Sequence, residues 1–432
     1  MNRRTFLFAS GLAATIGTVA ACAPGAGKSS DGAQTSGAGD AAGVATIWHY
    51  WDGTNADAFD AAVARFKEAN PDLEIDVVNV PNAEMLTKIQ TAAQTDTLPT
   101  MVIGDLVWAP QIASTGKTLD LSDRLSSATL DSFYESLATY GRQGEAIVSV
   151  PVSANCLGYM YNTTLFREAG LPIDQAPQTW EELVSAGQTI LDKTGKPAYE
   201  VITQAGDNGE GLTWNFQVNL WQAGGEFLNE DNTAAAFNTD AGRQALTFWV
   251  DLISQGLVPS PSTSWGEFEK GSAAAAPEGS WMVGIWAQDP PFEFGTAQIP
   301  APEGGQSATN LGGEQALVFD GAGADTAVAF LDWFLGEEEV LTWSQATGML
   351  PVRQDVGTSS EYTSWVSSTR PLLQPYVDAM ETARTRPATA LYPKVSYAFA
   401  VEIEKALNGS VSVDEALVAA EKAVNEVLNE AS

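Results

Sequence analysis

Tryptophan residues and short acidic or amide residues recur close together in this sequence. Thirteen tryptophans are many for 432 residues, and several stand beside polar or small residues instead of within apolar stripes. A sugar ring can stack its C–H face on an indole plane, while its hydroxyl groups need polar partners in a concave site. The tryptophans concerned are Trp48, Trp51, Trp108, Trp214, Trp265, Trp281 and Trp286. A single tryptophan is more often a core residue, so a carbohydrate site requires several of them to lie together.

Polar candidates accompany these tryptophans. Asp52 directly follows Trp51, and Asp105 precedes Trp108 by one helical turn. Both pairs come at the carboxyl ends of predicted parallel strands, where open α/β sheets bind ligands. Asn155, Glu278 and Glu314 are the further carboxylate and amide candidates.

The sequence carries no recognisable catalytic constellation. One histidine and two cysteines allow neither a Cys/His metal site nor a credible Ser-His-Asp relay. A phosphate-binding loop and a dinucleotide fingerprint are also missing, so we expect no enzyme activity, no metal and no cofactor. A glycosidase needs only two carboxylates roughly 5–10 Å apart, which leaves a surface-attached carbohydrate hydrolase as the enzymatic alternative.

The charge balance indicates which ligands the protein avoids. Lys and Arg number 21 against 54 Asp and Glu, giving a formal net charge of −33. Such a charge disfavours nucleic acid, anionic lipid and polyanionic ligands. A phosphate-bearing ligand would require Arg or Lys in the site, and no basic pair lies near the candidate loops. We therefore expect an uncharged ligand.

The elements that must position these residues form two lobes, because the chain is too long for one core. A strand over 44–48, a helix over 56–69 and a strand over 73–80 make a βαβ unit, typical of a mostly parallel sheet. The apolar segment 148–160 runs into a helix that begins at Asn162, so it is a predicted passage between the lobes. A short strand over 317–319 is expected to return the chain to the first lobe.

The predicted lobes are discontinuous in sequence. Lobe one comprises residues 44–150 and 315–368, and lobe two comprises residues 152–312 and 370–432. Capping boxes at Thr179–Glu182 and Ser412–Glu415 predict two helix starts in lobe two.

The N-terminus has the pattern of an export signal over residues 1–21. Arg3 and Arg4 precede an apolar run, as in a twin-arginine signal, and the run is too short to span a membrane. The residues ending at Cys22 resemble a bacterial lipoprotein box, which implies lipidation of Cys22 and anchoring to the outer face of the cell membrane. Residues 22–43 are rich in Gly, Ala and Ser and predict a flexible tether. An incidental cysteine in a plain secretory signal is the alternative, and Cys156 is expected to be buried.

The passage segment carries a specific motif. Residues 151–168 read Pro-Val-Ser-Ala-Asn-Cys-Leu-Gly-Tyr-Met-Tyr-Asn-Thr-Thr-Leu-Phe-Arg-Glu. This motif resembles the signature of the family 1 extracellular solute-binding proteins, the ligand-capturing subunits of ATP-driven (ABC) importers, and the resemblance extends over residues 44–430. It implies an α/β, two-lobed periplasmic-binding-protein-like fold (type II), in which each lobe is a mostly parallel sheet flanked by helices. It further implies a monomer that closes its interlobe cleft on a carbohydrate and delivers it to a membrane permease, and a glycerophosphoryl-type ligand is the alternative within the family.

The same resemblance assigns individual residues. Residues 268–281 resemble the segment in which a tryptophan stacks on bound sugar, which places Trp281 in the site. The position of Trp214 before Gly224-Gly225 is that of a second stacking aromatic, and Asn155 stands where maltose-binding proteins carry a ligand-contacting acid. The full set of predicted ligand-binding residues is Trp51, Asp52, Asp105, Trp108, Asn155, Trp214, Glu278, Trp281, Glu314 and Tyr397.

Overall fold

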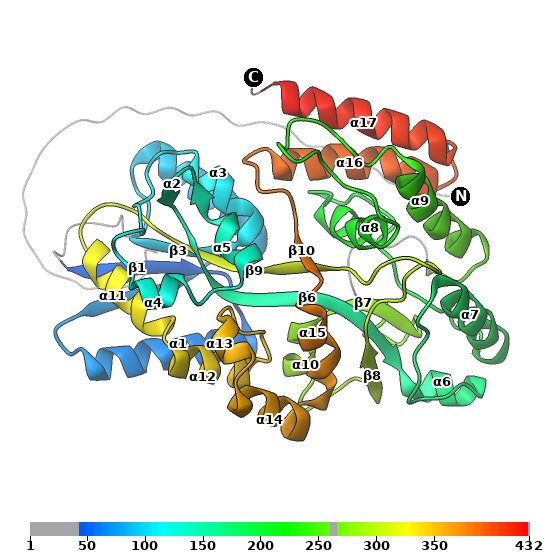
Figure 1. Ribbon diagram of the computed structural model, residues 1–432, viewed down its shortest axis with the longest axis horizontal. Helices are drawn as coiled ribbons and strands as arrows, with labels where there is room; N and C mark the ends of the chain where they lie inside the picture. The colour runs from blue at the N-terminus through cyan, green and yellow to red at the C-terminus, as the bar shows by residue number, and fades with distance from the viewer. Residues whose placement is uncertain (1–42, 260–265, 431–432) are drawn as a thin grey trace, which may run out of the picture. The chain divides into compact units, whose positions relative to one another are not determined.

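The computed structural model describes residues 43–259 and 266–430 (Figure 1). The predicted export signal, the predicted lipidation site Cys22, nearly all of the predicted tether and Trp265 lie outside these residues. Within the described ranges, every helix is too short or too polar to cross a membrane.

One sheet of eight strands organises the described chain. Its strand order is β2-β1-β3-β9-β6-β7, with β10 paired to β9 and β8 paired to β6, and β4 and β5 form a separate hairpin. The strands are β1 (Val44–His49), β2 (Glu74–Asn79), β3 (Met101–Asp105), β4 (Arg142–Gln143), β5 (Ala146–Ile147), β6 (Val150–Asn162), β7 (Ala275–Gly279), β8 (Phe294–Ala297), β9 (Thr309–Val318) and β10 (Ala383–Thr385).

Strand direction differs between the two parts of this sheet. β1 pairs in parallel with β2 and β3, as the predicted βαβ units require. β6 instead pairs antiparallel with β7, β8 and β9, so the expectation of mostly parallel strands in each lobe fails for this half. The chain leaves the β1–β3 region along β6 and returns to it along β9, and the two crossing strands must therefore run in opposite directions.

β6 and β9 run side by side through the middle of the sheet (Figure 1). Every residue of both strands is buried. β9 is longer than the predicted strand over 317–319, because Gly312 and Gly313 lie within the strand and not in a turn before it. A side chain on Gly313, whose φ is +133°, would clash with the backbone of Ser153 in β6, so glycine permits the close approach of the two strands.

Helices cover the sheet and form the rest of the fold. In the first part of the chain they are α1 (Gly53–Ala69), α2 (Asn82–Thr95), the 3₁₀ turn η1 (Leu106–Trp108), α3 (Ala109–Ala113), α4 (Ser127–Leu130), α5 (Glu135–Tyr140), α6 (Thr163–Ala169), α7 (Trp180–Thr194), α8 (Glu210–Gln222) and α9 (Asp240–Ser254). They continue with α10 (Ser280–Ile285), α11 (Ala324–Phe334), α12 (Glu337–Thr347), α13 (Gln354–Gly357), α14 (Ser360–Thr369), η2 (Pro371–Leu373), α15 (Gln374–Ala379), α16 (Tyr392–Leu407) and α17 (Val413–Asn429).

Two large clusters of buried apolar side chains form the core. One gathers side chains from α7, α8, α9, α16 and α17. The other gathers side chains from β1, α1, α11 and α12, together with Phe268, Trp286 and Tyr376. These last three residues come from segments that the sequence places in lobe two, and the predicted lobe boundaries remain a prediction.

The predicted helix starts depend on side-chain caps. The Asn162 side chain accepts hydrogen bonds from Thr164 N and Leu165 N and so begins α6. At α17, Ser412 and Glu415 cap each other's backbone reciprocally, which confirms the predicted capping box. At α7, Thr179 accepts from Glu182 N, but the Glu182 carboxylate accepts from Gln178 N, one residue earlier than predicted.

Replacing Ser412 with alanine should lower the free energy of unfolding by about 1 kcal/mol, because the cap of α17 is lost. Ser367→Ala is the matched control, since the Ser367 hydroxyl donates only to a helix carbonyl at Ser364 and caps nothing. Urea titration of both variants measures the difference. Equal stability of the two variants would contradict the prediction.

Candidate functional site

Glu314 lies where three strands of the sheet meet. In the strand register, Glu314 of β9 lies opposite Asp105 of β3 on one side and opposite Ser153 of β6 on the other. The Glu314 side chain is only 5% exposed, and the Tyr50 hydroxyl donates to Oε1 at 3.0 Å. Burial raises the pKa of Glu314 to about 7, although Tyr50, the Ser153 hydroxyl and the Trp51 indole act in the opposite direction. Near neutral pH this carboxyl group is therefore partly protonated.

Two indole rings stack beside this group. Trp214, in the second turn of α8, and Trp281, in the first turn of α10, have ring centroids 5.9 Å apart and planes inclined by 10°. The Trp214 backbone carbonyl accepts a hydrogen bond from Asn310 of β9, which ties α8 to the sheet. A side chain on Gly312 would meet both Asn155 and the Trp214 ring. Asn155, Gly312 and Trp214 therefore lie against one another.

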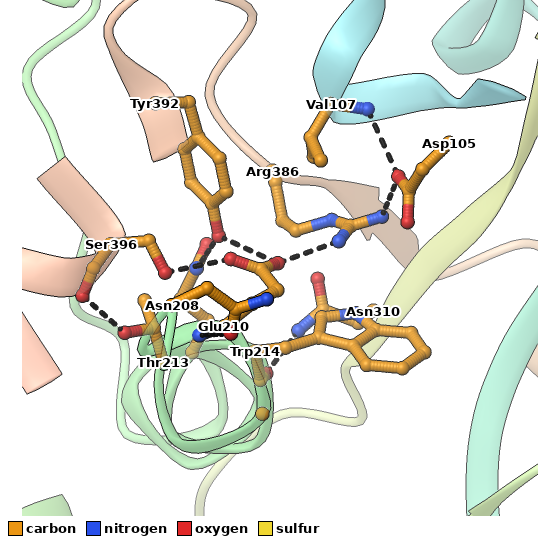
Figure 2. A network of polar contacts seen from close by, with 12 residues as sticks. Asp105, Val107, Asn208, Glu210, Thr213, Trp214, Asn310, Arg386, Tyr392 and Ser396 are labelled. Atoms are coloured by element: carbon orange, nitrogen blue, oxygen red, sulfur yellow. Dashed lines mark hydrogen bonds and ion pairs between the residues drawn. The ribbon is translucent and has the colours of Figure 1, made fainter. Parts of the chain in front are cut away.

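Arg386 joins the indole stack to the acidic residues (Figure 2). Its guanidinium carbon lies 5.1 Å from the Trp214 ring centroid. Nη2 donates to Asp105 Oδ1 at 3.1 Å, and Nη1 donates to Glu210 Oε1 at 2.6 Å. Burial by itself lowers the pKa of Arg386, but the two carboxylates more than offset this effect and raise it. The guanidinium is thus buried between two opposite charges.

Each carboxylate in this network is itself held in place. Asp105 Oδ1 also accepts from Val107 N at 3.0 Å, which caps the turn η1 at the end of β3. Glu210 begins α8, and its second oxygen accepts from the Ser396 hydroxyl of α16 at 2.7 Å. Burial raises the pKa of Glu210, and Arg386 and Ser396 oppose this shift. The network therefore connects β3, α8 and α16 (Figure 2).

The structure brings most of the predicted ligand-binding residues into one connected group. Trp108 joins it through an edge-on contact with Tyr50, at a centroid distance of 5.5 Å. The predicted residues in the group are Trp51, Asp105, Trp108, Asn155, Trp214, Trp281 and Glu314.

Three predicted residues stand apart from this group. Asp52 is exposed at the N-cap of α1 and forms no side-chain cap there. Tyr397 is 46% exposed on α16, with its backbone against Gly209. Glu278 is buried in β7, where burial first and then the nearby Glu200 raise its pKa to about 8.

Several buried polar atoms in the group have no hydrogen-bond partner among the residues that the structure describes. Buried polar atoms are normally paired, so an unpaired set at one place indicates a missing partner. These atoms are Asn155 Oδ1, Asn310 Oδ1 and Arg386 Nε, whereas Trp51 Nε1 and Ser153 Oγ lie against the Glu314 carboxylate and act on it. The set contains both donors and acceptors, and a ligand with hydroxyl groups could satisfy both.

Sequence reasoning missed Arg386 and its partner Glu210. The expectation that no basic residue pair lies near the candidate loops was wrong, because Arg386 contacts Asp105 and nearby Arg384 stacks on Trp221. The available signal was an Arg-Thr-Arg sequence at 384–386 in a chain with only 21 basic residues. Arg384 and Arg386 also line a pocket of about 690 Å³ with Tyr140, Trp221 and other residues of α5 and the loop after α8.

Other chemistries find little support in the described ranges. No group of three or more His, Cys, Asp or Glu side chains there could hold a metal ion. Cys156 is buried and its thiol donates to Tyr376 O at 3.5 Å, and burial raises the pKa of that thiol. A thiol with a raised pKa is a poor nucleophile.

Comparison with known proteins supports this picture of a two-lobed binding protein. A family model for bacterial extracellular solute-binding proteins matches residues 61–369. The chain therefore belongs to this family of bacterial extracellular solute-binding proteins, and the two-lobed α/β fold is confirmed.

Individual relatives are named for binding sugars or a glycerol phosphate. The crystal structure of the cyclic alpha-maltosyl-1,6-maltose binding protein from Arthrobacter globiformis is 60% identical, covers 90% of this chain and 99% of its own, and superposes with a TM-score of 0.84. The lactose-binding protein of Rhizobium radiobacter is 25% identical over 72% of this chain and 75% of its own length. The sn-glycerol-3-phosphate-binding periplasmic protein UgpB of Salmonella typhimurium is 24% identical over 73% of this chain and 76% of its own.

The raised pKa of Glu314 predicts a pH-dependent stability. A carboxyl group whose pKa is higher in the folded than in the unfolded state stabilises the fold fully below about pH 4.5 and loses that contribution as the pH rises to about 7. Glu314→Gln removes this titration. We therefore compare the free energy of unfolding of the native protein with that of Glu314→Gln. Between pH 4 and pH 8, the value for the native protein should fall by roughly 3 kcal/mol more than the value for Glu314→Gln.

Chemical denaturation of both proteins at several pH values measures this difference. Glu361→Gln, an exposed substitution in the first turn of α14, is the control for the loss of one acidic side chain. A constant difference between native protein and Glu314→Gln across the pH range would show that Glu314 titrates normally.

Proposed function

We propose that this protein is the solute-binding subunit of an ABC importer and captures a neutral oligosaccharide. The observation that carries this proposal is the set of unpaired buried donors and acceptors beside the stacked rings of Trp214 and Trp281. A pyranose offers an apolar face for an indole and hydroxyl groups that both donate and accept hydrogen bonds. Glycerol phosphate has hydroxyl groups but no ring face, and an apolar molecule has no hydroxyl groups.

The 60% identical relative narrows the ligand class. Its name records binding of cyclic alpha-maltosyl-1,6-maltose. We propose the same cyclic sugar, or an oligosaccharide closely related to it, as the ligand of this chain.

Individual residues would then take separate roles. Trp281 is more exposed than Trp214, and the Arg386 guanidinium already lies over the Trp214 ring. Trp281 would therefore stack its ring face on the sugar. Asn155 of β6 and Glu314 of the adjacent strand β9 would form hydrogen bonds with hydroxyl groups of the sugar. Asp52, Glu278 and Tyr397 would join the site only through a change in lobe positions, as in hinge closure around a ligand.

Export and delivery complete the proposal. The relatives are binding proteins, and we propose binding without turnover, in a monomer that hands its ligand to a membrane permease. The N-terminal pattern supports export and lipid anchoring through Cys22 to the outer face of the membrane. A carbohydrate hydrolase remains the enzymatic rival, since Glu278 and Glu314 both have raised pKa values as a general acid would; release of reducing sugar from the ligand would favour it.

Isothermal titration calorimetry against a panel of ligands tests the proposal. We expect binding of cyclic alpha-maltosyl-1,6-maltose, weaker binding of linear maltotetraose and no binding of sn-glycerol 3-phosphate. A ligand that binds only the folded state also raises the melting temperature, which gives an independent measurement. Binding of sn-glycerol 3-phosphate in preference to every sugar would overturn the proposal.

Trp281→Ala should weaken sugar binding by about 1–3 kcal/mol, the range found when an aromatic stacking partner is removed. Trp365→Ala is the matched control, because Trp365 is a partly exposed tryptophan of α14 that contacts Tyr362 outside the site. Calorimetry on both variants measures the effect. Unchanged affinity in Trp281→Ala would remove this residue from the site.

A further inference from the structure

Arg386 is a buried positive charge at the candidate site, yet two carboxylates already offset its charge. Its side chain is 2% exposed, and both terminal nitrogens donate to carboxylates, one from Asp105 and one from Glu210. Arginine stays protonated at any physiological pH, so only neighbouring anions can cancel its charge. The two carboxylates outnumber it, and the trio carries a formal charge of −1.

The position of this trio matters for what the site binds. Arg386 lies over the Trp214 ring, and Asp105 is paired in register with Glu314. An anion that reached the indole stack would therefore meet an arginine whose charge two carboxylates already offset, and up to three carboxyl groups. Bringing like charges together in a poorly hydrated site is costly.

We propose that Arg386, held between Asp105 and Glu210, is a specificity-determining residue that restricts the site to uncharged ligands. This inference rests on the proposed function and adds to it a rule for ligand charge. Asp105 and Glu210 do not bind the sugar under this rule. They act through Arg386, by offsetting its charge and by accepting from both of its terminal nitrogens, the pair that a phosphate or carboxylate group would engage in a bidentate contact.

Tethering makes these carboxylates hard to displace. Asp105 is fixed by its hydrogen bond to Val107 N, and Glu210 by the hydroxyl groups of Ser396 and Tyr392 (Figure 2). An external anion would have to compete with two groups that are already oriented and cost no further loss of translational freedom. Removing the charges of Asp105 and Glu210 should therefore allow Arg386 to bind an anion.

The test compares two ligands that differ in one charged group, maltose and maltose 1-phosphate. The variant Asp105→Asn/Glu210→Gln removes both compensating charges while keeping oxygen acceptors at both positions. By calorimetry, the native protein should bind maltose and not maltose 1-phosphate. The double variant should bind maltose 1-phosphate at least about tenfold more tightly than the native protein does, the effect of one charge-assisted hydrogen bond.

Two further variants assign the effect to Arg386. Adding Arg386→Met to the double variant should abolish the gain, because the unmasked positive charge is then gone. Asp240→Asn/Asp414→Asn is the matched control, since Arg243 also bonds two carboxylates but lies at the surface between α9 and α17. This control variant changes the net charge of the protein by the same amount as Asp105→Asn/Glu210→Gln, and it should leave the preference for maltose over maltose 1-phosphate unchanged. If the double variant at the site fails to fold, Asp105→Asn alone gives a smaller gain, with its amide oxygen still able to accept from Val107 N.

The outcomes separate this inference from the proposed function. If the native protein binds neutral sugars and the double variant still rejects maltose 1-phosphate, the charge rule is overturned and the proposed function stands. A gain that persists with Arg386→Met, or that appears equally in the Arg243 control, also overturns the rule. If the native protein binds no neutral sugar, the proposed function fails whatever the variants do.

Discussion

The antiparallel pairing of β6 and β9 holds the candidate site together. Both strands are buried along their whole length, so their side chains have fixed directions and their register decides which polar atoms meet. In this register Ser153 faces Glu314 and Asn155 faces Gly312. A shift of one residue would turn Glu314 to the opposite face of the sheet. The site is therefore fixed by rigid elements of the fold instead of by surface loops.

Buried charge is the second constraint, because a charged group removed from water needs compensation. The site meets this need in two ways. Arg386 has a carboxylate on each terminal nitrogen, and the carboxyl group of Glu314 has a raised pKa that favours its neutral form. Both the pairing of Arg386 and the protonation of Glu314 keep hydrogen-bonding groups in the site without an excess of positive charge. Such a site suits a ligand rich in hydroxyl groups.

The tryptophans illustrate how one residue type takes different roles. Trp51 and Trp286 belong to the apolar core, as most tryptophans do. Trp51 nevertheless directs its indole nitrogen toward the group around Glu314. Trp214 belongs to the other core cluster, and Trp281 packs against both clusters and stacks on Trp214. Flanking residues alone do not distinguish these cases, because the difference arises from which segments pack against each ring.

The sequence by itself determined the features that depend on near neighbours. From it follow the βαβ unit from β1 to β2, the Asn162 cap of α6 and the capping box of α17, and its motif at 151–168 identified the family. The stacking of Trp214 and Trp281 on a sugar stays a prediction. Only the tertiary structure decided that β6 and β9 run antiparallel and that Arg386 joins the site. Arg386 meets Asp105 across 281 positions of the chain. No local pattern encodes such a contact, because it exists only after the crossing strands have set β3 beside β9 and the segment that follows β10.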